Sequence, residues 1–227
     1  MLDVYLASPK NQLQAHLASG MDVLVSYYLH SEWQTQYMTT YRRLLIDSGA
    51  FSALNGATVD VFEYRDWLDE MRPQLPNIVA CAGLDSIEGD WRTSLKNLEV
   101  IPQTFGVYHD TDPPELLNEL VAIAKERDGW LGIGLHPPRT RRVPWMRRTL
   151  DRIDLDEIHV HGFALVKHSY LPWGSVDSTE WWRGAMMTQM NVAHLTAAER
   201  LEIQVKRYQR RTPRKDSHND TIDLFDD

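Results

Sequence analysis

The amino-acid sequence predicts a compact (β/α)8 barrel of the TIM type, with an extra helix near its carboxyl terminus. Eight short apolar segments recur along the 227 residues, and most are continuous apolar runs, as is typical of strands buried on both faces. More polar segments with helical spacing lie between them, and this alternation of strand and helix favours a parallel sheet closed into a barrel. A doubly wound open sheet is the alternative.

The expected elements follow in order along the chain. We expect strands within residues 2–8, 21–28, 43–49, 77–85, 103–109, 129–135, 157–163 and 172–178. The clearest helices between them are 60–74, 90–101 and 112–128, the last with prolines at its start. Residues 195–211 form one more helix, which Thr196 and Glu199 begin as a capping box.

The domain organisation expected from these elements is simple. Residues 1–190 form the barrel, residues 191–212 form a helix packed on it or extending from it, and 213–227 form a flexible polar tail. Apolar residues make up 43% and charged residues 25% of the chain, which is typical of a globular protein. No apolar run approaches the roughly 20 residues that cross a bilayer, and the amino terminus lacks a targeting pattern, so we expect a cytoplasmic protein without a membrane partner.

Polar side chains stand where the expected strands end. In barrels of this type, functional residues collect at the carboxyl ends of the strands. Here those ends carry Ser26, Tyr27, Tyr28, Asp47, Ser48, Asp85, Ser86, Tyr108, His109, His136, His161 and Asp177. Singly, each aspartate reads as a helix cap and each histidine as a satisfied interior residue. Three aspartates at one mouth repel one another, however, and persist mainly where a substrate or cation uses them.

A metal site is one interpretation of this mouth. The side chains that could bind a divalent cation are Asp47, Asp85, His109, His161 and Asp177. The first strand lacks the His-x-His pair of metal-dependent barrel hydrolases, but His159 and His161 point the same way from one late strand, so the residues alone leave this alternative open. The single cysteine, Cys81, excludes an internal disulfide and a zinc site built from several thiolates.

The stretch IDSGAFS, residues 46–52, resembles the DSGGFQ motif of tRNA-guanine transglycosylases. It is still more similar to the smaller 7-deazaguanine DNA transglycosylases, the DpdA group, many of them from phages. Similar segments follow in the same order from about residue 20 to residue 185, namely LVSYY (24–28), GLDS (83–86), GVYHD (106–110), GIGL (132–135), VHGFAL (160–165) and GSVDSTEW (174–181). The specific parts are DSGAFS and SVDSTEW.

This resemblance implies an enzyme that exchanges guanine in DNA for a 7-deazaguanine, with no metal and no other cofactor. One carboxylate attacks the sugar carbon as guanine leaves, and the incoming base then displaces the enzyme. A second carboxyl group moves the proton between the two bases, and a third reads the amine and ring N–H of the base. The implied partners are DNA and a free 7-deazaguanine base (preQ0-like).

The matching motifs assign roles to particular residues. Asp47 takes the place of the general acid/base, and Asp177 that of the nucleophile. Glu180 is the alternative nucleophile, because in the tRNA enzymes a second acid three residues later attacks. The implied substrate-binding residues are Ser48, Gly49, Phe51, Asp85, His109, Gly132, Gly134 and His161. Among them Asp85 recognises the base, the two later glycines let it lie against the backbone, and Phe51 walls the pocket.

DNA is the expected polymer, because the chain cannot build the zinc site of three cysteines and a histidine that the tRNA enzymes carry. The target guanine must be flipped out of a duplex or reached in an opened strand. We expect phosphate contacts from Arg139, Arg141, Arg142, Arg147, Arg148, Lys206 and Arg207, although a solvated helix face is the alternative. The net charge of -8 argues against unspecific binding, and the short chain leads us to expect a homo-oligomer or a partner subunit.

Two other functions fit the same residues. A DNA or nucleoside N-glycosylase would use the same carboxylates and let water complete the reaction. A non-catalytic DNA-binding subunit of a modification complex would keep the barrel without the reaction, but the presence of all three aspartates argues against it.

Overall fold

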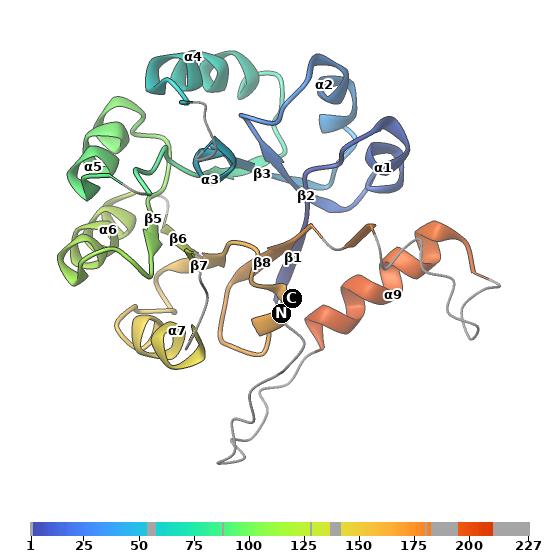
Figure 1. Ribbon diagram of the computed structural model, residues 1–227. Helices are drawn as coiled ribbons and strands as arrows, with labels where there is room; N and C mark the ends of the chain where they lie inside the picture. The colour runs from blue at the N-terminus through green and yellow to red at the C-terminus, as the bar shows by residue number, and fades with distance from the viewer. Residues whose placement is uncertain are drawn as a thin grey trace.

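The protein is an eight-stranded parallel barrel surrounded by helices (Figure 1). The structure, a computed structural model, describes residues 2–53, 58–87, 89–127, 129–136, 142–179, 181–182 and 195–210. The strands are β1 (Asp3–Ala7), β2 (Asp22–Ser26), β3 (Arg43–Asp47), β4 (Ile78–Cys81), β5 (Val107–His109), β6 (Trp130–Gly134), β7 (His159–Gly162) and β8 (Ser175–Ser178). They are hydrogen-bonded in the order β4-β3-β2-β1-β8-β7-β6-β5, and each lies within a segment that the sequence predicted.

The sheet closes between its two ends, β4 and β5. A parallel bridge joins Ala82, which directly follows β4, to Phe105, which lies shortly before β5. The Phe105 N–H donates to the carbonyl of Cys81 at 2.9 Å, and the Gly83 N–H donates to the carbonyl of Phe105 at 2.7 Å. The predicted TIM-type barrel is therefore confirmed, and the open doubly wound sheet is excluded.

Helices surround the strands, as the ring of labels in Figure 1 shows. They are α1 (Gln12–Leu17), α2 (Glu32–Met38), α3 (Ala50–Ala53), α4 (Val61–Met71), α5 (Trp91–Val100), α6 (Pro114–Glu126), α7 (Arg142–Leu150) and α9 (Ala197–Gln209). Only a short 3-10 helix, η1 (Val166–His168), follows β7, where the alternation predicted a longer helix. No helix in the described part of the chain is long and apolar enough to cross a membrane.

Local side-chain bonds explain where the predicted helices begin. Asp60 accepts hydrogen bonds from two backbone N–H groups at the start of α4, and Asp90 accepts one at the start of α5. Thr196 and Glu199 form the predicted capping box of α9. This last helix packs beside β1, with Leu201 fully buried, so it covers the barrel rather than extending away from it.

The barrel interior is filled by alternate residues of each strand. Side chains two positions apart on a strand point to the same side, so Asp3, Tyr5 and Ala7 of β1 all face inward. A buried apolar cluster fills the middle of the barrel, formed by Tyr5, Ala7, Leu24, Leu45, Ala80, Ala82, Phe105 and Val107. Polar interior side chains lie toward the two ends of the barrel and along β7 and β8, where His159, His161 and Ser175 are hydrogen-bonded to one another.

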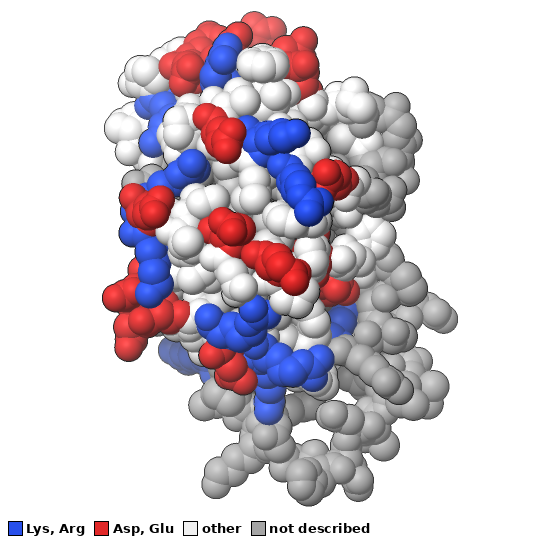
Figure 2. Space-filling model, turned by 90° about the vertical axis from the view of Figure 1, so that its left-hand side faces the viewer, with Lys and Arg blue, Asp and Glu red and all other residues white. Residues whose placement is uncertain are grey.

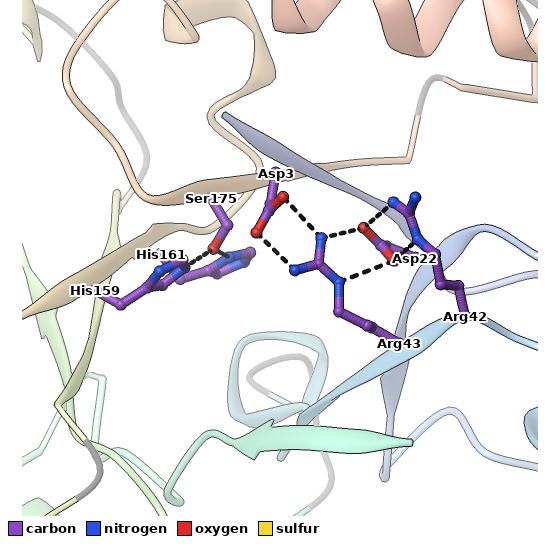
Figure 3. A network of polar contacts seen from close by, with 7 residues as sticks. All are labelled: Asp3, Asp22, Arg42, Arg43, His159, His161 and Ser175. Carbon is purple, nitrogen blue, oxygen red and sulfur yellow. Dashed lines mark hydrogen bonds and ion pairs between the residues drawn. The ribbon is translucent and has the colours of Figure 1, made fainter. Parts of the chain in front are cut away.

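An ion-pair network ties together the amino-terminal ends of three strands (Figure 3). Arg43 of β3 contacts Asp3 of β1 at 2.7 and 2.8 Å, and Asp22 of β2 at 2.5 and 3.1 Å. Arg42 adds bonds of 2.6 and 2.8 Å to Asp22. Burial raises the pKa of Asp22, but the hydrogen bonds from the two arginines outweigh burial and leave the pKa below its ordinary value.

We expect Asp22→Asn to lower the free energy of unfolding by about 3 kcal/mol at neutral pH, because it leaves two paired arginines without their buried partner. The depressed pKa means that the carboxylate stabilises the fold above its unfolded pKa and loses that effect as pH falls through the folded pKa. Urea unfolding should therefore show the gap between variant and wild type closing below about pH 4.

The matched control is Asp66→Asn, which removes the exposed partner of Arg65 and should cost less than about 1 kcal/mol. An equal loss in both variants would show that the network does not stabilise the barrel.

Candidate functional site

Three aspartates and a histidine converge at the carboxyl-terminal mouth of the barrel. Asp47 ends β3, Asp85 follows β4, His109 ends β5, and Asp177 lies in β8. The charges of the other three all act on the Asp47 carboxyl group, so each of them lies within electrostatic range of Asp47. No group of three or more His, Cys, Asp or Glu side chains among the described residues is arranged to hold a metal ion.

The Asp47 carboxyl group is an acid that titrates near neutrality. Burial is the largest cause and raises its pKa to about 7, and the negative charges of Asp85 and Asp177 act in the same direction. A hydrogen bond from the Gly49 N–H and the charge of His109 oppose them only partly. At neutral pH Asp47 therefore exists in both protonation states, which suits a group that both gives and takes a proton.

Ser48 and Gly49 build the turn that holds Asp47 in place. Gly49 has φ +82°, and a Cβ atom there would lie 2.4 Å from the Cβ of Tyr28 and 2.6 Å from the hydroxyl of Ser26. Ser48 is fully buried, and its hydroxyl accepts a bond from the Ala50 N–H at 3.4 Å. The structure thus gives these two predicted substrate-binding residues a part in shaping the loop.

Two aromatic rings remain exposed beside this turn. Phe51, on α3, is 43% exposed, and Tyr28, in the loop after β2, is 37% exposed. Their loops meet where Gly49 packs against Tyr28. An exposed ring offers a surface on which a flat base can stack, whereas the role expected for Phe51, as a wall of the pocket, stays a prediction.

Asp85 and His109 form a nearly buried pair. The Nε2 of His109 is hydrogen-bonded to the Oδ2 of Asp85, and Asp112 accepts a 2.7 Å bond from the His109 backbone N–H. Burial lowers the pKa of the imidazole, but the bond to Asp85 and the surrounding negative charges outweigh it and raise the pKa overall. His109 therefore retains positive charge at higher pH than an ordinary histidine, and this charge helps to compensate Asp85.

Gly132 and Gly134 leave space for neighbouring rings of the protein. A Cβ atom at Gly134 would lie 2.5 Å from the Cε1 of His109, and one at Gly132 would lie 2.7 Å from the Cε2 of Phe163. Packing alone therefore accounts for both glycines. Their predicted contact with the base stays a prediction.

Asp177 is buried and anchored through one oxygen. Its Oδ1 accepts a 2.7 Å bond from the Ala164 N–H and lies 3.3 Å from the Nε2 of His161. Ala164 has φ 54°, a backbone conformation that costs an alanine energy and is common at functional sites. Within the described part of the chain both bonds end on Oδ1, and Oδ2 has no hydrogen-bond partner there.

His161 lies beneath Asp177 rather than at the open mouth. It is fully buried, and its second ring nitrogen, Nδ1, is 2.8 Å from the hydroxyl of Ser175. That hydroxyl also lies 2.7 Å from the Nε2 of His159. Sequence reasoning missed Ser175, although its position two residues before Asp177 on one strand signals that both side chains face inward.

The predicted basic residues are spread along two helices. Arg142 begins α7 at the mouth end, whereas Arg147 and Arg148 lie in its last turn, roughly 8 Å further along the helix. Figure 2 shows basic and acidic side chains interspersed over the face that carries α5 and α6, with basic ones gathered at its lower end, at the height of α7.

On α9, Lys206 and Arg207 also lie in the last turn, and Lys206 is paired with Glu202 at 3.3 Å. The predicted residues Glu180, Arg139 and Arg141 lie outside the described residues, as does the predicted tail.

Comparison with solved structures supports the fold. A mutant tryptophan synthase α-subunit from the hyperthermophile Pyrococcus furiosus is similar to this chain with a TM-score of 0.54 and 11% sequence identity, over 90% of this chain and 96% of that chain. At this identity the likeness concerns the fold alone. No protein-family model and no curated protein matches the sequence. Fold and site together define a TIM-type barrel with an acidic mouth.

We expect Gly49→Ala to destabilise the protein by about 3 kcal/mol, because the new methyl group collides with Tyr28 in addition to straining the backbone. Gly20→Ala is the matched control, since Gly20 also has positive φ (+76°) but has nothing within 4 Å of the added atom, and should cost only about 1 kcal/mol. If chemical unfolding shows the same loss of stability in both variants, the close approach of Gly49 to Tyr28 contributes nothing to the cost.

We expect Asp47→Asn to change how stability depends on pH. The folded-state pKa of about 7 lies above the ordinary value of 3.8, so this group favours folding most below about pH 4, and that contribution is lost as pH rises through 7. Relative to wild type, the variant should therefore gain roughly 2–4 kcal/mol between pH 4 and pH 8. Unfolding curves across this range measure the gain, which exposed Asp151→Asn should not show.

Proposed function

We propose that this protein is a DNA base-exchange enzyme, which replaces guanine with a 7-deazaguanine through a covalent bond between a carboxylate and the sugar. The observation that supports it most is the different environment of two carboxyl groups at one mouth. Asp47 titrates near pH 7, whereas Asp177 is held by Oδ1 and its Oδ2 has no hydrogen-bond partner among the described residues. Such a division between a proton-transfer group and a nucleophile is what glycosyl transfer requires.

In the first step, the Oδ2 of Asp177 attacks C1′ of the deoxyribose as the bond from C1′ to the base breaks. The departing guanine takes the electron pair of that bond and receives the proton of Asp47, which is left as a carboxylate. The negative charge of Asp177 favours the acid form of Asp47 before the reaction, because it repels the charge of an ionised Asp47.

In the second step, the incoming 7-deazaguanine gives its N9 proton to Asp47 and attacks C1′. Asp177 leaves as a carboxylate, and the two inversions together retain the configuration at the sugar. The cycle returns every proton to its starting place, so the reaction needs no other proton donor. A carboxyl group with a pKa of about 7 performs both transfers with little energetic penalty.

Asp85 is the proposed base-recognition residue. Its Oδ2 is held by His109, and among the described residues its Oδ1 has no hydrogen-bond partner, so Oδ1 can accept from the N1–H and exocyclic amine of guanine. A 7-deazaguanine presents the same two donors, which explains how one carboxylate serves both the leaving and the entering base. Phe51 and Tyr28 supply the aromatic surface beside them.

The polymer substrate is proposed from the basic stretch at the mouth. Arg142 begins α7 there, and the sequence places two further arginines just before it. Phosphate contacts at this position would hold a strand whose guanine is turned out of the stack into the barrel mouth. A second subunit, either another copy or a partner, would add grip on the DNA.

The test is mass spectrometry of nucleosides from duplex and single-stranded DNA that has been incubated with the protein and a panel of 7-deazaguanines. We expect a deazaguanine deoxynucleoside with the wild type, and at least about 100-fold less with Asp177→Ala. Ser169→Ala, which removes a buried hydroxyl that makes no hydrogen bond to the three aspartates, should behave as wild type. Release of guanine without incorporation would indicate a glycosylase instead, and no change in the DNA would indicate a DNA-binding subunit.

A further inference from the structure

A chain of polar side chains crosses the buried interior of the barrel and ends at Asp177. Figure 3 shows the hydroxyl of Ser175 between two imidazole rings, 2.7 Å from the Nε2 of His159 and 2.8 Å from the Nδ1 of His161. The other nitrogen of His161, Nε2, lies 3.3 Å from the Oδ1 of Asp177. The chain therefore runs from the amino-terminal end of β7 to the mouth.

Strand geometry and close packing hold these groups in line. His159 and His161 both face inward from β7, and Ser175 pairs with His161 in the parallel register of β7 and β8. A Cβ atom at Gly174 would lie 2.7 Å from the Nδ1 of His159, so the ring fits only over a glycine. Trp130 covers the same ring, with the two ring centres 3.9 Å apart.

The direction of each hydrogen bond follows from its acceptor. The Asp177 carboxylate can only accept, so the Nε2 of His161 must carry the proton that it donates. The Nδ1 of a neutral His161 is then an acceptor, and the Ser175 hydroxyl donates to it. Ser175 has a single proton, so its oxygen accepts from the Nε2–H of His159.

The surroundings of His159 maintain these hydrogen-bond directions, because they keep its imidazole neutral. Burial is the largest cause that lowers the pKa of His159 to about 4, and the positive charge of Arg43 acts in the same direction, against the negative charge of Asp3; a proton on His161 would lower the pKa of His159 further. His159 is therefore neutral at physiological pH and has one N–H to give. Asp3 and Arg43, which belong to the ion-pair network at the amino-terminal end of the barrel, thus influence the pKa of His159.

We propose that Ser175 is a positioning residue, which holds His161 in the Nε2–H tautomer and so fixes the Oδ1 of Asp177. Without the hydroxyl, a neutral imidazole is free to place its proton on Nδ1 and to turn the lone pair of Nε2 toward the carboxylate. Repulsion between this lone pair and the Asp177 carboxylate would rotate the Asp177 side chain and displace its Oδ2. The positioning of a nucleophile rests on the proposed function, whereas the tautomer of His161 does not.

The experiment combines proton–nitrogen NMR of the histidine side chains with kinetics of base exchange. We expect both His159 and His161 of the wild type to be neutral Nε2–H tautomers. In Ser175→Ala, His161 should become a mixture of tautomers, and kcat should fall about 10-fold with KM unchanged. Ser175→Thr keeps the hydroxyl and should retain the wild-type tautomer, and Ser169→Ala should alter neither measurement.

A charged or Nδ1–H His161 in the wild type would overturn the proposal without any variant having to fold. An unchanged tautomer and kcat in Ser175→Ala would overturn it as well. If the tautomers are as expected but the wild type exchanges no base, the hydrogen-bond chain stands and the proposed function fails, so the two failures are distinguishable.

Discussion

The cost of burying negative charge governs the organisation of this barrel. Three aspartates meet at one mouth, where burial and the negative charges of Asp85 and Asp177 penalise the ionised form of Asp47. Each one is stabilised differently. Asp47 retains a proton up to about pH 7, Asp85 pairs with His109, and Asp177 receives a backbone N–H and an imidazole on a single oxygen. Three residues of one type thereby acquire three different chemical properties.

The same constraint operates at the opposite end of the barrel, with a different solution. There Asp22 is compensated by two arginines, and its pKa falls rather than rises. A carboxylate with two bound cations is suited to stabilising a fold, since it stays ionised over the working pH range. A carboxyl group that titrates near neutrality, as Asp47 does, is suited to moving protons. The two ends of the barrel therefore differ in whether their buried carboxyl groups are held ionised or hold a proton near neutral pH.

Much of this architecture could be predicted from the order of residues. Continuous apolar runs marked most of the strands, as is typical of strands buried on both faces, whereas β7 and β8 carry polar side chains inside the barrel. Asp60, Asp90 and Thr196 marked helix starts, because capping is a local interaction between a side chain and the next few N–H groups. The missing helix after β7 was not foreseen, since nothing local requires a strand connection to be helical.

The sequence by itself determined which residues stand at the strand ends, since chain order and strand alternation settle which side chains share the mouth. Only the tertiary structure decided what each does there. The pKa of Asp47, the pairing of Asp85 with His109, and the chain from His159 to Asp177 all depend on contacts between strands distant in sequence. Protonation and hydrogen-bond direction are set by burial and by these neighbours, and such quantities exist only once the barrel has closed.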